Sequence, residues 1–150
     1  LKNNHNINLS DLLNVRSFLD HNRTYDLDAD RTDYNYNKLS GYSYCWKGKM
    51  ITGLEIQNDL VLHFKKWTKH IHKHGLILIE LHNTSIDLVK NNLGSIPMIS
   101  YMATHGFSDQ FIVEHGVYKE CLEKAGFTIL RDFQTYPNQD LKMVSLHMLA

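Results

Sequence analysis

The chain has 150 residues, with 16 acidic and 16 basic side chains and an apolar fraction of 43%. This length suits one domain with a real core and is too short for two. Its balanced charge, without a long basic block, gives no electrostatic footprint for nucleic acid. No apolar run approaches the roughly 20 residues that span a bilayer, and no signal peptide is recognisable. Cys45 and Cys121 lie far apart, so we expect a soluble, reduced, cytoplasmic protein.

The first predicted strand covers residues 12–19 and leads directly into the polar cluster Asp20-His21-Asn22-Arg23. Residues 24–53 are polar and aromatic without clear periodicity, so we expect a long loop or lid-like insertion there. Aspartates at positions 26, 28 and 30 alternate as in a calcium loop. The glycine and the distal glutamate of such a loop are missing, which argues against calcium.

From Leu54 the pattern becomes helical, because apolar side chains recur at three- and four-residue spacings. The predicted buried stripe comprises Leu60, Val61, Phe64, Trp67 and Ile71, and the predicted polar face comprises Asn58, Asp59, Lys65, Lys66 and Lys69. Basic residues and histidines gather before Gly75, where they suit the negative end of the helix dipole. His70 and His74 share a helix face, but no HExxH motif surrounds them, so we expect a solvated helix end.

The apolar run at residues 76–79 continues into Glu80-Leu81-His82 and predicts a buried strand with a polar carboxyl end. A second helix is predicted from the N-cap Ser108, with Asp109 in its first turn, to the C-cap Gly126. Its predicted buried stripe comprises Phe111, Tyr118, Cys121, Leu122 and Ala125. Strands follow at 127–133 and 141–149, with a turn around residue 137. The order predicts a layered α/β sheet with a terminal antiparallel hairpin.

The polar strand ends are the candidate functional residues, because ligands bind beyond the carboxyl ends of parallel strands. His105 and Gln110 flank a loop and can converge on one point, although glutamine is a poor metal ligand and Gln110 also suits a helix N-terminus. His82 is the natural third ligand, and Glu80 on the same strand face is placed to orient it. The cluster at residues 20–23 suits a base, a ligand, a substrate clamp or a plain turn.

Three segments together carry a family resemblance: residues 16–23 (RSFLDHNR), 75–82 (GLILIELH) and 104–110 (THGFSDQ). They resemble the C-methyltransferase domains of polyketide synthase loading modules, the group in which the apratoxin pathway enzyme uses S-adenosylmethionine and a mononuclear iron centre. The resemblance covers nearly the whole chain apart from residues 26–50. It implies a three-layer, Rossmann-like class I methyltransferase sheet, mostly parallel, with the terminal antiparallel hairpin.

The sequence departs from that fold at its beginning. No Gly-rich turn follows a first strand, and no acidic residue ends a second strand to hold the ribose hydroxyls. The chain also begins with Leu rather than Met. We therefore expect residues 1–150 to be the C-terminal portion of a single methyltransferase-like domain that is incomplete at its N-terminus.

The resemblance implies methyl transfer from S-adenosylmethionine to the α-carbon of a malonyl-type thioester on an acyl carrier protein, beside neighbouring synthase domains. It implies Fe(II) or Mn(II) held by His82, His105 and Gln110, and catalytic roles for His21, Arg23 and His105. The residues that it implies for binding the cofactor are Arg16, Ser17, Phe18 and Asp20. Neither nucleic acid nor a membrane is an expected partner.

Two other functions remain open from the sequence. One is a non-catalytic methyltransferase-like scaffold inside a large synthase, which the missing first half of the fold would favour if the chain were complete. The other is a metal-independent methyltransferase acting on a small molecule, with His105 as the general base.

Overall fold

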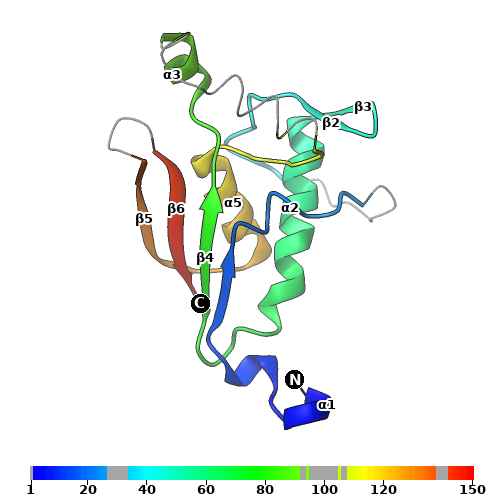
Figure 1. Cartoon of the computed structure of the whole chain (residues 1–150), viewed down its shortest axis with the longest axis vertical. Coiled ribbons are helices and arrows are strands. Elements are labelled where there is room, and N and C mark those ends of the chain that lie inside the picture. The colour runs from blue at the N-terminus through cyan, green and yellow to red at the C-terminus, as the bar shows by residue number, and fades with distance from the viewer. Residues whose placement is uncertain (1, 27–33, 92–93, 95–104, 106–107, 138–141) are drawn as a thin grey trace.

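The computed structural model describes residues 2–26, 34–91, 94, 105, 108–137 and 142–150. Its main sheet has four strands in the order β1-β4-β6-β5. These are β1 (Asn14–Ser17), β4 (Leu76–Leu81), β6 (Lys142–Leu149) and β5 (Ile129–Pro137), and they lie side by side in Figure 1. β1 runs parallel to β4, whereas β6 is antiparallel to both β4 and β5.

The mixed α/β architecture and the terminal antiparallel hairpin agree with the prediction. The sheet is less parallel than expected, because only the β1–β4 pairing is parallel among the described strands. The arrangement is compatible with a Rossmann-like fold, in which a parallel β–α–β unit and an added hairpin share one sheet.

Two helices, α2 (Gly53–Thr68) and α5 (His115–Ala125), pack against the sheet and against each other. α2 begins with a capping box, in which Thr52 and Glu55 satisfy each other's backbone N–H groups. α5 ends where Gly126 adopts the left-handed conformation, with φ 103°, as predicted for its C-cap. Figure 1 shows α5 behind the strands, with α2 beside it.

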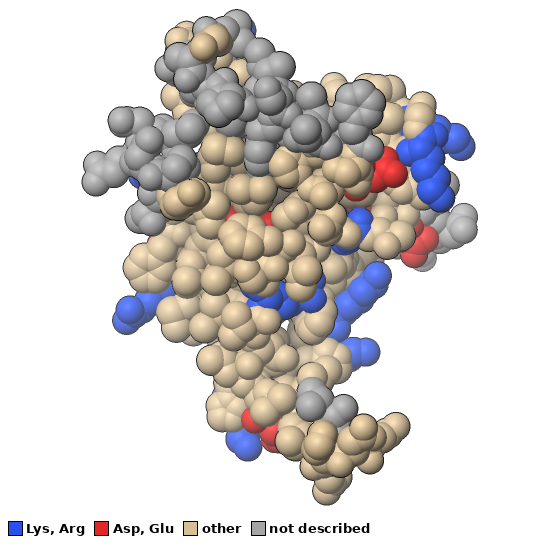
Figure 2. Space-filling model, viewed as in Figure 1, with Lys and Arg blue, Asp and Glu red and all other residues tan. Residues whose placement is uncertain are grey.

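The core lies on the helix-covered face of the sheet. Along β4, Leu76, Leu78 and Glu80 are buried on that face, while the residues between them are only partly buried. The largest buried apolar side chains are Ile56, Leu60, Phe64, Leu76, Leu78, Tyr118, Leu122 and Leu149. The opposite face is open: Val15 is 58% and Phe133 is 48% exposed, and Figure 2 shows few charged side chains over the strands.

The segment before α5 corrects one prediction. The helix begins at His115, not after Ser108, and Asp109 has a φ of 53° instead of a helical value. The reason is tertiary: Phe111 donates its N–H to the His21 carbonyl, and Asn83 donates to the Val113 carbonyl. These bonds stretch residues 111–113 between the ends of β1 and β4 and outweigh the local capping signal.

The predicted loop at residues 24–53 contains a hairpin of β2 (Tyr44–Trp46) and β3 (Lys49–Ile51). Lys47 and Gly48 both have positive φ, as a two-residue turn of this kind requires. Asn58 and Asp59, predicted on an exposed face of α2, are instead buried. Side chains from the preceding segment cover them, since Tyr36 donates to Asn58 and Arg23 pairs with Asp59.

Three short helical segments were not predicted: α1 (Lys2–His5), η1 (Leu9–Asp11) and α3 (Ile86–Asn91). Each is too short for a periodic apolar pattern to reveal it. The predicted turn around residue 137 continues beyond the described residues, and the aspartates at 28 and 30 lie outside them. No helix in the described part of the chain is long and apolar enough to cross a membrane.

Candidate functional site

An imidazole–carboxylate pair lies at the carboxyl ends of the two parallel strands. The Glu80 side chain is buried, and one of its oxygens accepts from His21 Nδ1 at 2.6 Å. The other oxygen accepts from the Asp20 backbone N–H at 2.7 Å. Because a carboxylate accepts, His21 carries a proton on Nδ1, which leaves Nε2 as the nitrogen that can take a proton.

Glu80 was predicted to orient His82, and the structure gives it a different partner. Both side chains are buried on the helix-covered side, but Glu80 reaches across to the segment after β1 while His82 faces β6. The pairing of β1 with β4 explains this, because it brings residue 21 next to the end of β4. Strand periodicity alone does not distinguish between these two neighbours.

His105 lies beside this pair. Its ring stands edge-on to that of His21, with the centroids 6.1 Å apart. His105 and Gln110 line one small pocket, of about 50 Å³, whose other lining residues are Tyr42, Ser43, Tyr44, Asn83 and Ile112. The structure therefore brings together three predicted site residues: His21, His105 and Gln110. Imidazole is a common ligand of transition metals, and the amide oxygen of Gln110 is a weaker one beside it.

Asp20 is buried next to the His21–Glu80 pair and contacts side chains of β1, α2 and α5. Its Oδ1 accepts from Arg16 at 2.8 Å and lies 3.0 Å from His63 Nε2, and its Oδ2 accepts from the Tyr118 hydroxyl at 2.7 Å. Burial acts to raise the pKa of Asp20, but the hydrogen bond from His63 and the charge of Arg16 outweigh it and hold the pKa at about 2. Asp20 is thus an ionised anchor for the end of β1.

Arg23 is also enclosed. Its guanidinium donates to the Asp59 carboxylate at 2.6 Å and to the backbone carbonyls of Asp20 and Ile56 at 2.9 and 3.1 Å. This arrangement joins the segment after β1 to α2. A contact between Arg23 and a substrate stays a prediction, because the guanidinium is engaged within the protein here.

Ser17 and Phe18 are the accessible members of the predicted cofactor-binding group. Ser17 ends β1 and is exposed, and Phe18 is 43% exposed with a φ of 54°. A left-handed conformation is strained for a phenylalanine, and strain of this kind concentrates at functional sites. The hydrogen bond from Phe18 N–H to the Ile79 carbonyl, 2.8 Å long, holds it there.

The predicted ligand His82 lies in a separate group of histidines. His82 Nε2 is 2.6 Å from Ser145 Oγ, which in turn is 2.7 Å from His147 Nε2. The ring of Tyr118 lies 4.9 Å from that of His82, between centroids. His82 does not line the small pocket of His105 and Gln110.

A second cluster extends this group toward the surface. His115 Nε2 and His147 Nδ1 lie 3.0 and 3.4 Å from the same oxygen of Asp132, and Lys119 donates to the other oxygen at 2.8 Å. Burial lowers the pKa of His147 to about 4 and also lowers that of His115. Burial acts to raise the pKa of Asp132, but Lys119 and His115 outweigh it and lower the pKa. Neutral imidazoles therefore face an ionised carboxylate near pH 7.

Residues 1–147 match a methyltransferase family described as the AprA MT2-like domain. The chain belongs to this family. The match covers the segments at 16–23, 75–82 and 104–110 and confirms the resemblance that they carry. Comparison with curated proteins gives no match. Membership supports a role for the chain in methyl transfer in general.

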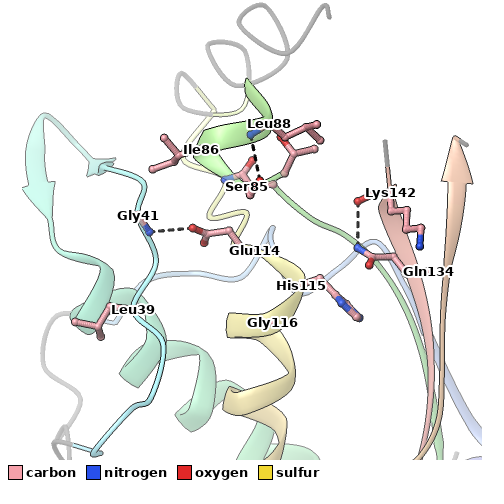
Figure 3. Close-up of a pocket in the computed structure, with 12 residues that line it drawn as sticks. Leu39, Gly41, Ser85, Ile86, Leu88, Glu114, His115, Gly116, Gln134 and Lys142 are labelled. Atoms are coloured by element: carbon pink, nitrogen blue, oxygen red, sulfur yellow. Dashed lines mark hydrogen bonds between the residues drawn. The ribbon is translucent and has the colours of Figure 1, made fainter. Parts of the chain in front are cut away.

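A larger pocket of this AprA MT2-like domain, of about 540 Å³, opens where α5 begins. Figure 3 shows Glu114 and His115 at that point, with Gln134 of β5 and Lys142 of β6 across from them. Glu114 accepts from the Gly41 N–H at 2.9 Å, so its carboxylate fastens the segment before β2 to the rim. The pocket thus borders the cluster of His115 and Asp132 on its exposed side.

The sequence did not reveal the cluster of the AprA MT2-like domain formed by His115, Asp132 and His147. These residues come from α5, β5 and β6, so no spacing along the chain connects them. One signal was present: in the alternating strand at 142–149, His147 occupies a buried position between Ser145 and Leu149. A histidine on the buried face of a strand needs polar partners, which directs attention to the neighbouring strands.

Proposed function

We propose that this AprA MT2-like domain forms the acceptor side of a C-methyltransferase that uses S-adenosylmethionine. The acceptor is the α-carbon of a malonyl-type thioester carried on an acyl carrier protein. The observation that carries the proposal is the His21–Glu80 pair at the ends of β1 and β4, beside His105 and Gln110, in a chain that belongs to a methyltransferase family. Ligand sites of α/β sheets lie at this edge.

His21 is the proposed base. Its Nε2 takes the α-proton of the thioester, while Glu80 holds the proton on Nδ1 and stabilises the positive ring that results. The carbanion left on the α-carbon attacks the methyl group, and the sulfonium leaves as the neutral thioether. Glu80 acts through His21 and is therefore a positioning residue.

His105 and Gln110 are the proposed metal-binding residues of this site, because they line one pocket, where His105 offers an imidazole and Gln110 a weaker amide oxygen. A bound Fe(II) or Mn(II) ion would polarise the thioester and carboxylate oxygens and so make the α-proton more acidic. The resemblance implies His82 as a third ligand, although its ring nitrogen faces Ser145 in this structure.

S-adenosylmethionine is proposed to bind near the end of β1, where Ser17 and Phe18 are accessible and Phe18 offers an exposed aromatic face. Arg16 and Asp20 form an ion pair with each other and thereby stabilise the segment that carries Ser17 and Phe18. The acyl carrier protein and neighbouring synthase domains are the proposed partners.

The test is methylation of a malonyl-type acyl carrier protein by the intact protein, followed by mass spectrometry of the acyl group. His21→Ala is expected to lower kcat by about 10²–10⁴-fold, as loss of a general base does, with partial rescue by added imidazole. Glu80→Gln is expected to lower kcat with little change in KM. His72→Ala removes an exposed imidazole far from the site and is the matched control.

Full activity of His21→Ala would remove His21 from the mechanism. Calorimetry with S-adenosylmethionine separates the scaffold from either enzyme, and activity with and without chelation separates the two enzyme mechanisms. Absence of binding by the intact protein would favour the scaffold, whereas activity that survives chelation and is lost in His105→Ala would favour a metal-independent methyltransferase.

A further inference from the structure

The cluster of His115, Asp132 and His147 has the composition and spacing of a metal site. One ligand atom from each residue lies within 4.8 Å of the others. The two histidine nitrogens are 3.0 and 3.4 Å from Asp132 Oδ1. Tetrahedral coordination with metal–ligand bonds of about 2.0–2.1 Å places ligand atoms roughly 3.3 Å apart. The two separations that involve Asp132 Oδ1 therefore match, and the third is at most 4.8 Å.

A second observation points to a ligand independently. His147 is fully buried, and its Nδ1 has no hydrogen-bond partner although it faces the Asp132 carboxylate. A buried polar atom that lacks a hydrogen-bond partner is unfavourable. A cation between the two atoms would satisfy both.

We propose that His115, Asp132 and His147 bind one divalent transition-metal ion. Two imidazoles and a carboxylate form a donor set that suits Zn(II), Co(II) or Fe(II). The site lies apart from the pocket of His105 and Gln110, and the inference does not rest on the proposed methyl transfer. It joins α5, β5 and β6, so the metal acts as a clamp between the helix and the terminal hairpin.

The surroundings are consistent with this ion. The His115 and Asp132 side chains are 19% and 21% exposed, which gives the ion a path from solvent. Ser145 holds Nε2 of His147 at 2.7 Å and thereby directs Nδ1 toward Asp132. Lys119 opposes binding through its charge, but it occupies Oδ2 and leaves Oδ1 to the metal.

The test uses the intact protein, stripped with a chelator and titrated with Co(II) and Zn(II). Co(II) in a site with nitrogen and oxygen donors gives a visible absorption band, and Zn(II) displaces it. Asp132→Asn and His115→Ala alter partly exposed residues and are expected to weaken Co(II) binding by about 100-fold or more, since even residues that only orient ligands change affinity by 10–100-fold. His72→Ala removes an exposed imidazole outside the cluster and is the matched control, which is expected to keep the band.

Thermal unfolding provides a second measurement. Zn(II) is expected to raise the Tm of the wild type and of His72→Ala more than that of Asp132→Asn, because a ligand stabilises only the state that binds it. Co(II) binding of unchanged stoichiometry and affinity in both Asp132→Asn and His115→Ala would overturn the proposal. So would Co(II) binding that is lost entirely in His105→Ala, because no ion would then be bound at the cluster of His115, Asp132 and His147. Methyl transfer plays no part in either measurement, so failure here leaves the proposed function untouched.

Discussion

Asp20 stabilises the end of β1 because its buried carboxylate receives hydrogen bonds from side chains on three elements. Its pKa in the folded protein is about 2, below the ordinary value of 3.8. A depressed pKa contributes stability above the unfolded pKa, and this contribution is lost as the pH falls from about 4 through 2. A shift of this size corresponds to about 2 kcal/mol.

We therefore expect Asp20→Asn to lower the free energy of unfolding at pH 7 by about 2 kcal/mol and to reduce its pH dependence between pH 4 and 2. Urea unfolding at several pH values measures both effects. Asp11→Asn is the control, since Asp11 is exposed and its pairing with Lys73 is a surface contact. Equal stability of Asp20→Asn and the wild type at pH 7 would contradict this account.

Much of the candidate site at the residue scale could be predicted because it lies next to strand ends. His21 and Glu80 were identified from the polar residues that follow apolar runs and His105 from the loop segment at 105–110, and the structure places them together. The predicted partner of Glu80, His82, was wrong, because strand periodicity does not reveal that the pairing of β1 with β4 brings His21 next to Glu80. The cluster of His115, Asp132 and His147 was missed, because only the fold brings these three elements into contact.

At the scale of elements, α2 shows which signals in a sequence are sufficient. Its apolar stripe predicted the helix, and the Thr-x-x-Glu pattern at 52–55 marks its start. α5 shows where such signals fail. Ser108 suits an N-cap, but the backbone hydrogen bonds of Phe111 and Asn83 keep residues 111–113 extended, so the helix begins later. The N-cap preference of a serine is worth about 1 kcal/mol, and several tertiary hydrogen bonds together outweigh it.

Thr52→Ala is expected to lower the free energy of unfolding by about 1 kcal/mol, because it removes the oxygen that accepts the Glu55 N–H at 3.2 Å. Thr52→Ser retains the hydroxyl and is expected to restore most of that loss. Chemical denaturation of the two variants and the wild type makes the comparison. If serine were as destabilising as alanine, packing of the threonine methyl and not the cap would account for the loss.

At the scale of the whole molecule, the sheet is covered by helices on one face only among the described residues. The apolar run at 76–79 predicted a buried strand but did not distinguish a strand covered on both faces from one covered on a single face. Leu78 is 1% exposed, whereas Ile79, the next residue of the same strand, is only partly buried. This difference in exposure between Leu78 and Ile79 shows that the core lies on only one face of the sheet.

Leu78→Ala is expected to lower the free energy of unfolding by about 3 kcal/mol, because it leaves a cavity among α2, α5 and the sheet. Ile79→Ala removes a side chain of the same size from the open face and is expected to cost about 1 kcal/mol. Both changes leave the backbone hydrogen bonds between strands in place, so the comparison of the two variants reports side-chain packing alone. Losses of equal size in the intact protein would contradict the one-sided core and show that its open face, with Val15 and Phe133, is covered in solution.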